Sequence, residues 1–203
     1  MNTYRAEIIN AAIDLFAEYG ISNVPIKMIA VKIPISRSNF YYYFKSKNDV
    51  IDSIINEFDG MIARSISMIK QQTETGIDAE SLLTRLFLAF GKEDSQRGRK
   101  ITRIIFANHG YDERIGNYLK ESFFHEREAR ISCIFDMLVT GGKVKPLNTE
   151  TAARMLNKFF IASALEDTFE YPFEKHEKPQ CLNCLRKDCL YLIKKILSGE
   201  FET

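Results

Sequence analysis

The sequence contains few cysteines, few prolines and almost no excess charge of either sign. Its 203 residues include 4 Cys, 5 Pro and no Trp. Four cysteines are too few for a scaffold built on disulfides, so the fold must depend on a hydrophobic core, which a hydrophobic content of 45% can supply. The net charge of only +1 gives no support to a nucleic-acid-binding surface that extends over the whole chain.

Long apolar runs are also absent. No window approaches the length of a transmembrane helix without charged residues. The first residues, MNTYRAEIIN, lack an uninterrupted apolar stretch, which predicts that they are not a signal peptide. We therefore expect a cytoplasmic protein with no membrane partner.

Apolar residues recur at helical spacing almost throughout, and no useful strand pattern appears. The expected fold class is all-α, with a three-helix unit over residues 1–47 and a larger helical bundle over 48–203. Gly20 should end the first helix, and Ser36 and Ser46 should cap the third and fourth. The fourth helix, roughly 20 residues long, should bury Val50, Ile54, Phe58, Ile62, Ile66 and Ile69. Later helices are expected near 79–91, 97–108, 112–140, 149–171 and 180–199, with Asn148 or Thr149 capping the fourth of these.

Charge is concentrated at the N-terminal end. Residues 1–47 hold six Lys/Arg and three Asp/Glu, a balance of +3, whereas residues 48–203 hold 22 and 24, a balance of −2. A short basic N-terminal segment followed by a slightly acidic remainder is compatible with local contact to phosphates.

The segment from Pro25 to Lys47 has the composition of a helix-turn-helix. Such a motif places its second helix in the major groove of DNA. Arg37 can bind guanine and Asn39 can bind adenine, each through two hydrogen bonds. Phe40, Tyr41 and Phe44 are expected to face inward. The predicted DNA-binding residues are Lys27, Ser36, Arg37, Ser38, Asn39, Tyr42, Tyr43 and Lys47, of which the tyrosines and lysines would contact phosphate or sugar.

Residues 4–52 resemble the N-terminal domain of the TetR family of transcriptional regulators. The similarity includes the phrase IINAAIDLFAEYGISN and the spacing of Ile29-Ala30, Ile35-Ser36, Tyr41, Phe44 and Lys47. It implies a sequence-specific regulator that binds a double-stranded DNA operator and is not an enzyme. We predict a repressor that a small molecule releases from DNA.

The segment departs from the family pattern at the turn and at the helix starts. Pro34 stands where glycine is usual, Ile33 replaces an alanine, and Ser38 replaces a small residue that is often glycine. Pro25 replaces a threonine. Because proline cannot adopt a positive φ, the turn must differ from one built on glycine.

The resemblance also implies that the C-terminal body forms a homodimer and holds a small-molecule effector. The helices near 151–171 and 180–199 are the expected dimerisation helices. Aromatic and polar residues in the middle of the chain could line an effector pocket. The candidates are Phe87, Phe90, Arg103, Phe106, His109, Phe123 and Phe124, although for each one taken singly a place in the core is favoured over contact with a ligand.

A cysteine cluster supports an alternative hypothesis, in which the regulator senses metal or redox state. His176, Cys181, Cys184 and Cys189 have the spacing of soft ligands around one ion. On a helix, however, Cys181 and Cys189 would lie about 12 Å apart, and buried cysteines behave as small hydrophobes. We therefore predict no cofactor. A dimeric scaffold that does not bind DNA is a third hypothesis.

Overall fold

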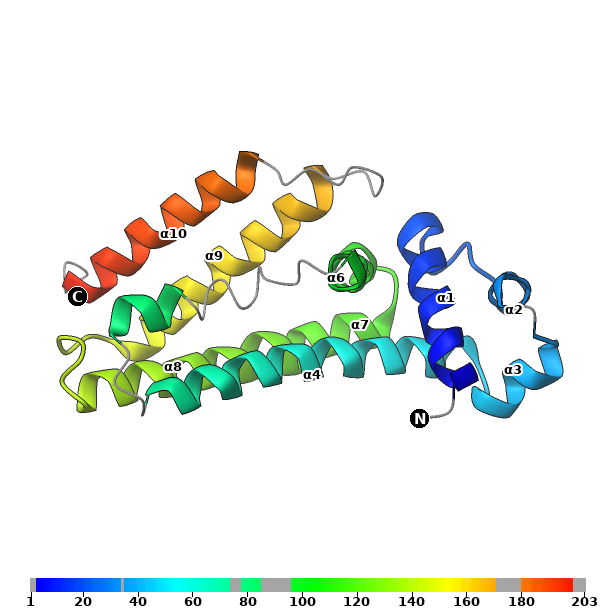
Figure 1. The fold of residues 1–203 in the computed structure, drawn as a ribbon, viewed down its shortest axis with the longest axis horizontal. Helices are drawn as coiled ribbons and strands as arrows, with labels where there is room; N and C mark the ends of the chain where they lie inside the picture. The colour runs from blue at the N-terminus through cyan, green and yellow to red at the C-terminus, as the bar shows by residue number, and fades with distance from the viewer. Residues whose placement is uncertain (1–2, 34, 74–77, 85–95, 171–179, 199–203) are drawn as a thin grey trace. The chain divides into compact units, whose positions relative to one another are not determined.

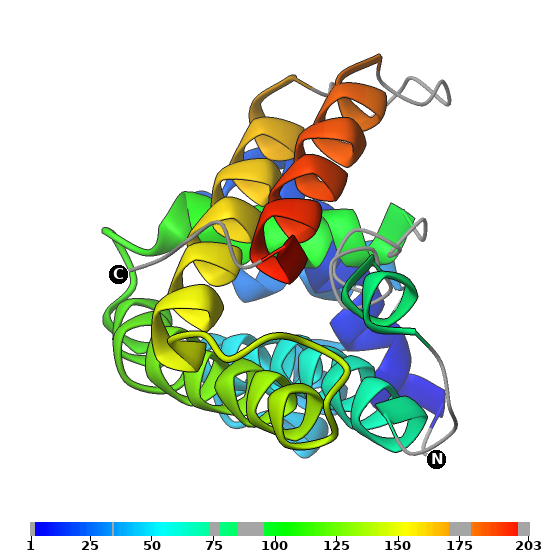
Figure 2. The ribbon, with the colours of Figure 1, turned by 90° about the vertical axis from the view of Figure 1, so that its left-hand side faces the viewer.

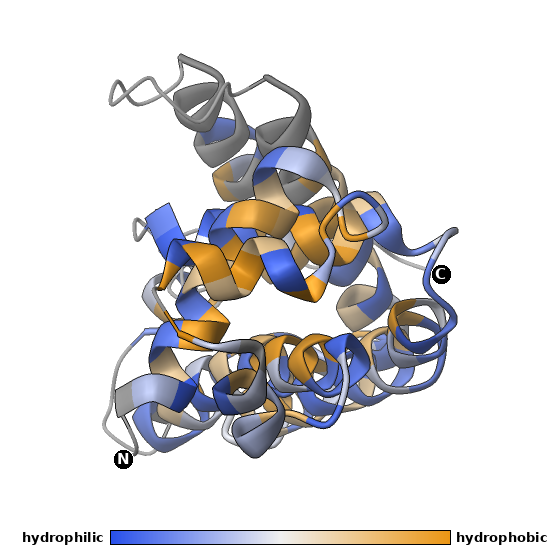
Figure 3. Cartoon of the chain, turned by 90° about the vertical axis from the view of Figure 1, so that its right-hand side faces the viewer, coloured by the Kyte–Doolittle hydropathy of each residue, from blue (hydrophilic) through white to orange (hydrophobic). Residues whose placement is uncertain are grey.

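The computed structural model describes residues 3–33, 35–73, 78–84, 96–170 and 180–198, and every regular element among them is helical. The expected all-α class is therefore confirmed. Several of the helices that face the viewer in Figure 3 carry both hydrophobic and hydrophilic residues along their length. Figure 1 labels the α-helices α1 Thr3–Tyr19, α2 Ile26–Lys32, α3 Arg37–Tyr43, α4 Lys47–Thr73, α6 Gln96–Asn108, α7 Glu113–Asn117, α8 Phe124–Thr140, α9 Thr149–Glu170 and α10 Gln180–Ser198. The π-helix η1, Tyr118–Phe123, follows α7 directly and leads into α8.

Two of the expected helices differ from those observed. The fourth helix has 27 residues rather than about 20, and it buries all six of the predicted apolar side chains. The segment expected as one helix over 112–140 is instead α7, η1 and α8 in succession. Asp112 caps α7 by accepting hydrogen bonds from the N–H groups of Arg114 and Ile115. Apolar spacing alone does not distinguish a continuous α-helix from one interrupted by a π-helical turn.

The chain folds into two compact units. Unit 1 comprises residues 1–61 and 93–119, and unit 2 comprises residues 62–92 and 120–203. The division falls inside α4, and α6 and α7 fold together with the N-terminal helices rather than with the rest of the C-terminal body. The boundary after residue 47 remains a prediction of where the DNA-binding segment ends.

The core of unit 1 is built around α1. Ile8, Ala12, Leu15 and Phe16 are buried, whereas Tyr19, which lies at helical spacing from them, is 46% exposed. Gly20 ends the helix with φ +79°, and its N–H donates to the Phe16 carbonyl. This left-handed conformation is one that glycine adopts without steric cost.

Ionic contacts connect α6 to the N-terminal helices within unit 1. The Asp14 carboxylate of α1 lies 2.7 Å from Lys100 Nζ of α6 and 3.2 Å from Lys32 Nζ of α2. Arg97 of α6 donates two hydrogen bonds, of 2.7 and 2.8 Å, to Glu57 of α4, and a third to Asn10 of α1. The N-terminal half of α6 is thereby held to α1, α2 and α4.

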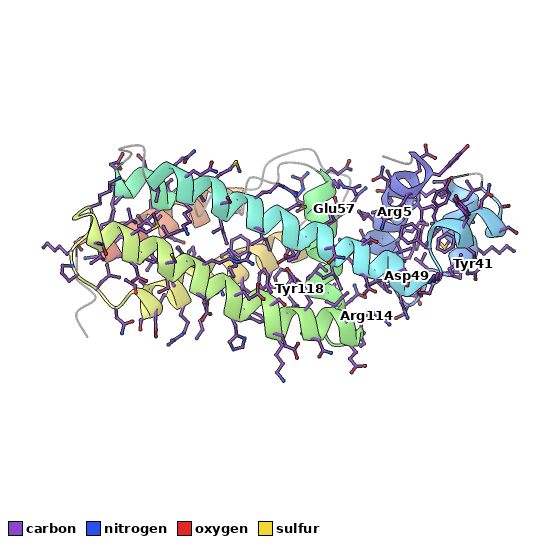
Figure 4. The ribbon with its side chains drawn as sticks, turned by 90° about the horizontal axis from the view of Figure 1, so that it is seen from below. Arg5, Tyr41, Asp49, Glu57, Arg114 and Tyr118 are labelled. Atoms are coloured by element: carbon purple, nitrogen blue, oxygen red, sulfur yellow. The ribbon has the colours of Figure 1, made fainter. Side chains whose placement is uncertain are left out.

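Further contacts hold the segment after α6 to α4. Arg114 Nε lies 3.5 Å from Asp52 Oδ1, and the Tyr118 hydroxyl donates to Asp59 across 3.3 Å (Figure 4). The ring of Phe58 packs edge-on against the rings of Phe106 and Tyr118. These contacts place the C-terminal part of unit 1 along the first half of α4.

Unit 2 is a bundle in which α8 packs on α9 and α9 on α10 (Figure 2). Ile131, Phe135 and Leu138 of α8 are buried, as are Ile193 and Ile196 of α10. The α8–α9 connection turns at Gly142, where φ is +65°. Asn148 then caps α9 by accepting a hydrogen bond from the Thr151 N–H across 2.9 Å, which confirms one of the two predicted caps.

No helix in the described part of the chain is both long and apolar enough to cross a membrane.

We predict that Asp14→Asn destabilises the protein at neutral pH. Burial alone would raise the pKa of Asp14, but hydrogen bonds from Lys100 and Lys32 outweigh it and hold that pKa below its ordinary 3.8. A lowered pKa means that the stabilising effect is present above pH 3.8 and is lost as the pH falls further. Because the carboxylate is partly exposed, each pair should contribute only about 0.2–1 kcal/mol.

The measurement is urea unfolding of both proteins between pH 3 and pH 7. The difference in unfolding free energy should be largest at pH 7 and should shrink below pH 3.8. Asp136→Asn, an exposed position on α8, is the control and should have little effect at any pH. An equal effect of Asp14→Asn at pH 3 and pH 7 would contradict the ionic origin of the contact.

Candidate nucleic-acid interface

The short helix α3 begins at a capping serine, as its sequence predicts. Ser36 has an extended backbone, and its hydroxyl oxygen accepts a hydrogen bond from the Asn39 N–H across 3.1 Å. The preceding helix ends at Ile33 with φ −116°, and the Ile35 N–H donates to the Ala30 carbonyl across 3.2 Å. Ile33 is not left-handed, so the described start of this turn does not use the positive φ that a glycine would allow.

Two phenylalanines determine which face of α3 points outward. Phe40 and Phe44 are buried with their rings 6.0 Å apart. Tyr42 is 80% exposed and Tyr41 is 52% exposed. The expectation that Tyr41 faces inward with the phenylalanines is therefore wrong. Adjacent residues of a helix lie about 100° apart, so burying Phe40 leaves Tyr41 near the edge, with its ring against the Phe40 ring.

The third tyrosine of the run is partly covered. Tyr43 packs edge-on against Tyr42, with ring centroids 4.9 Å apart, and lies 6.2 Å from the ring of Tyr4 on α1. The Arg5 guanidinium lies 4.9 Å over the ring of Phe44 and donates to the Ser53 hydroxyl of α4 (Figure 4). Contacts from α1 and α4 therefore hold the C-terminal end of α3 in place.

The start of α4 is fixed by reciprocal caps. The Asp49 N–H donates to the Ser46 hydroxyl oxygen across 3.2 Å, which confirms Ser46 as the cap. The Asp49 carboxylate in turn accepts from the Ser46 hydroxyl and from the Lys45 N–H, at 2.9 and 2.8 Å. The Ser46 hydroxyl holds the pKa of Asp49 below its ordinary value, which keeps this side chain ionised at the N-terminus of the helix.

Lys47 has a structural role that its position in the motif did not reveal. Its ammonium group donates to the Ile21 carbonyl at 2.9 Å and to the Val24 carbonyl at 3.3 Å. Both carbonyls belong to the connection between α1 and α2. The side chain therefore ties the start of α4 to the start of the helix-turn-helix, and its contact with phosphate remains a prediction.

The predicted DNA-binding residues of α2 and α3 lie largely on the surface. Lys27, Ser36, Ser38 and Asn39 are exposed. The side chain of Arg37 lies outside the described part of the chain, so its contact with guanine stays a prediction. Sequence reasoning missed the roles of Arg5 and Tyr41. Neither had a spacing signal, because Arg5 acts through contacts with distant helices and Tyr41 was assigned to the wrong face.

The predicted effector-pocket residues are divided between the two units. In unit 1, Phe106 is buried, Arg103 is half-buried and His109 is exposed. In unit 2, Phe123 is buried and Phe124 half-buried. Phe87 and Phe90 lie outside the described residues. The pocket therefore remains a prediction.

The side chains of the cysteine cluster are likewise outside the described part of the chain, and so is His176. Among the described residues, no group of three or more His, Cys, Asp or Glu side chains could hold a metal ion. Cys133, which is exposed on α8, is the free cysteine that the structure describes.

Comparison with known proteins supports the geometry of the N-terminal unit. Residues 8–54 match the model for bacterial regulatory proteins of the tetR family. A relative from Bacillus subtilis (strain 168), named "Probable HTH-type transcriptional regulator YttP", is 20% identical over 137 residues. That match covers 68% of this chain and 63% of the relative, so the chain spans less than two thirds of the relative's length.

Solved structures share the fold over nearly the whole chain. Salmonella enterica GusR superposes with a TM-score of 0.66 at 22% identity, covering 94% of this chain and 95% of its own. A regulatory protein of the tetR family from Rhodococcus RHA1 superposes with a TM-score of 0.67 at 16% identity, covering 97% and 98%. The helix-turn-helix over residues 8–54 is therefore a TetR-family segment, and the chain as a whole shares the fold of solved regulators of that family.

Proposed function

We propose that the protein is a homodimeric repressor that binds a double-stranded operator through α3 and leaves it when a small molecule binds the C-terminal body. The observation that carries the proposal is the orientation of α3. Burial of Phe40 and Phe44 turns Asn39 and Tyr42 outward, together with the exposed Lys45 just after the helix. A short helix with amide, phenol and ammonium groups on its outer side has the chemistry to bind base edges and phosphates.

A dimer follows from the geometry of DNA recognition. Two reading helices must reach half-sites about 34–36 Å apart, one turn of the double helix. The TetR resemblance assigns dimerisation to helices of the C-terminal body, and α9 and α10 are the candidates that the sequence indicated.

The path of the chain supports a ligand-dependent release. The backbone passes between unit 1 and unit 2 after residues 61, 92 and 119. A rearrangement of unit 2 would therefore act on α4, α6 and α7 at covalent connections. We propose that the effector favours an arrangement in which the two α3 helices no longer match adjacent major grooves, which requires different effector affinities for the two arrangements.

The first prediction concerns DNA binding itself. DNA fragments that the full-length protein selects from a genomic pool should bind with an affinity that falls at least about tenfold between 50 and 200 mM salt, because phosphate contacts release counterions. Affinity without selection of any sequence, or no affinity at all, would contradict the proposal and favour a scaffold. Loss of DNA binding on oxidation or zinc chelation would favour the metal or redox alternative.

A second prediction tests base reading. Arg37→Ala should cost roughly 1–3 kcal/mol per half-site and relax the base preference at one position of the selected sequence. Arg99→Ala, at an exposed position of α6, is the matched control and should change neither affinity nor preference. Unchanged affinity and unchanged preference for Arg37→Ala would contradict its assignment to a base.

A third prediction separates the two lysines. Lys27→Met should weaken binding to all sequences alike without changing the unfolding free energy, because Lys27 is exposed. Lys47→Met should weaken binding and also lower the unfolding free energy by about 1.5–3 kcal/mol, since it removes charged hydrogen bonds to two carbonyls. Denaturant unfolding and DNA titration of both variants make the comparison. If Lys47→Met has the same unfolding free energy as the wild type, the hydrogen bonds from Lys47 to the α1–α2 connection do not contribute to stability.

A further inference from the structure

A row of three tyrosine rings joins the first turn of α1 to the outer side of α3. Tyr43 is the last residue of α3, and its ring packs edge-on against that of Tyr42, with the centroids 4.9 Å apart. On its other side lies the tilted ring of Tyr4, with the centroids 6.2 Å apart. Both separations fall within the range of about 4.5–7 Å that paired aromatic rings prefer. The first turn of α1 therefore lies beside the C-terminal end of α3 (Figure 1).

The two outer rings of the row are exposed. Tyr42 is 80% exposed and Tyr4 is 50% exposed, whereas Tyr43 between them is half-buried. Single exposed tyrosines are ordinary on a protein surface. Here, however, both exposed rings are connected through a third ring that the contacts at the end of α3 hold in place. Their relative position is therefore set before a partner binds, which lowers the entropy that binding must cost.

The charges around the row suit an anionic partner. Arg5 follows Tyr4, Lys45 follows α3, and both residues are exposed. Neither α3 nor the first turn of α1 contains an acidic residue. The Asp49 carboxylate, which lies next to Lys45, is engaged in capping α4. Phenol hydroxyls beside cationic groups have the chemistry to donate hydrogen bonds to phosphate oxygens.

The row is continuous with the side of α3 that is proposed to face DNA. The two ring separations place Tyr4 no more than about 11 Å from Tyr42, which is the length of about three phosphates of one DNA strand at about 3.4 Å each along the axis. With Tyr42 against DNA, the ring of Tyr4 is therefore within reach of the backbone that borders the same groove.

We propose that Tyr4 is a further DNA-binding residue, which donates its hydroxyl to a backbone phosphate at the edge of the half-site that α3 reads. Tyr43 is a positioning residue that holds the rings of Tyr4 and Tyr42 side by side. A phosphate contact identifies no base, so Tyr4 contributes affinity and not sequence preference. The inference rests on the proposed binding of DNA through α3 and extends that interface to α1.

The first test is the substitution Tyr4→Phe in the full-length protein, which keeps the ring and removes only the hydroxyl. Binding should weaken about three- to tenfold per half-site. The loss should be the same for the selected DNA and for single-base variants of it. The dependence of affinity on salt should not change, because the lost donor carries no charge. Tyr19→Phe, at the other end of α1 and 46% exposed, is the matched control and should bind as the wild type does.

A scan of the DNA backbone locates the contact. Single methylphosphonate substitutions, placed one at a time along the selected DNA, each remove the charge of one phosphate. At the phosphate that Tyr4 contacts, the substitution should weaken the wild type but have a smaller effect on Tyr4→Phe. This phosphate should lie within about three nucleotides of the site that crosslinks to a photoreactive group at position 42. Tyr19→Phe should reproduce the wild-type pattern at every phosphate.

A double substitution tests the role of Tyr43. Tyr43→Leu removes the ring between Tyr4 and Tyr42, so the loss caused by Tyr4→Phe should shrink in that background. An undiminished loss would contradict the positioning role of Tyr43.

Two results would overturn the assignment of Tyr4. One is an affinity of Tyr4→Phe equal to that of the wild type, and the other is a weakened affinity with an unchanged pattern across the phosphates. Both results presuppose a wild-type protein that binds DNA, so they contradict only this inference. A wild-type protein that binds no DNA contradicts the proposed function itself.

Discussion

Burial of Phe40 and Phe44 is the constraint on which the candidate interface depends. Phe40 lies within the seven-residue helix α3, Arg37–Tyr43, and Phe44 is the residue that caps its C-terminal end. With both rings in the core of unit 1, the rotation of α3 about its axis is set. Asn39 and Tyr42 must then point to solvent, because no other side of the helix is left for them. A helix this short has little stability of its own, so its orientation comes from the side chains that it buries.

The contacts around α3 extend this constraint to the rest of unit 1. Arg5 joins the ring of Phe44 to Ser53 of α4, and Lys47 joins α4 to the connection between α1 and α2. Asp14 continues the network to α6 through Lys100. Unit 1 therefore includes segments from before and after the first part of unit 2 along the chain, so the backbone passes between the two units after residues 61, 92 and 119.

The sequence predicted the helical class, the caps and the buried stripe of α4, because these depend on local spacing and on hydrogen bonding within a few residues. Ser36, Ser46 and Asn148 all cap the helices that their positions indicate. The misassigned features depend on contacts between residues distant in the chain. Phe40 occupies the core position on α3, so the neighbouring Tyr41 lies at the edge of the core. Tyr19 is exposed although its spacing matches that of the buried residues of α1.

The burial of Arg127 and Asn157 was not predictable from spacing for the same reason. Each looks like an ordinary polar residue on an amphipathic helix, and only the packing of α8 on α9 buries them. Arg97 and Lys100 are similar, since their partners lie 40 and 86 residues away in α4 and α1. Long-range ionic contacts leave no periodic signature in a single sequence.

Photo-crosslinking from α3 tests the central claim most directly, because it reports which surface lies against DNA. A photoreactive phenylalanine derivative would replace Tyr42, which is 80% exposed, or the control Tyr191 on α10, which is 65% exposed. The account predicts crosslinks to the selected DNA from position 42 and none from position 191. A protein that binds the same DNA without crosslinking from position 42, or that crosslinks equally from position 191, would contradict the assignment of α3 as the reading helix.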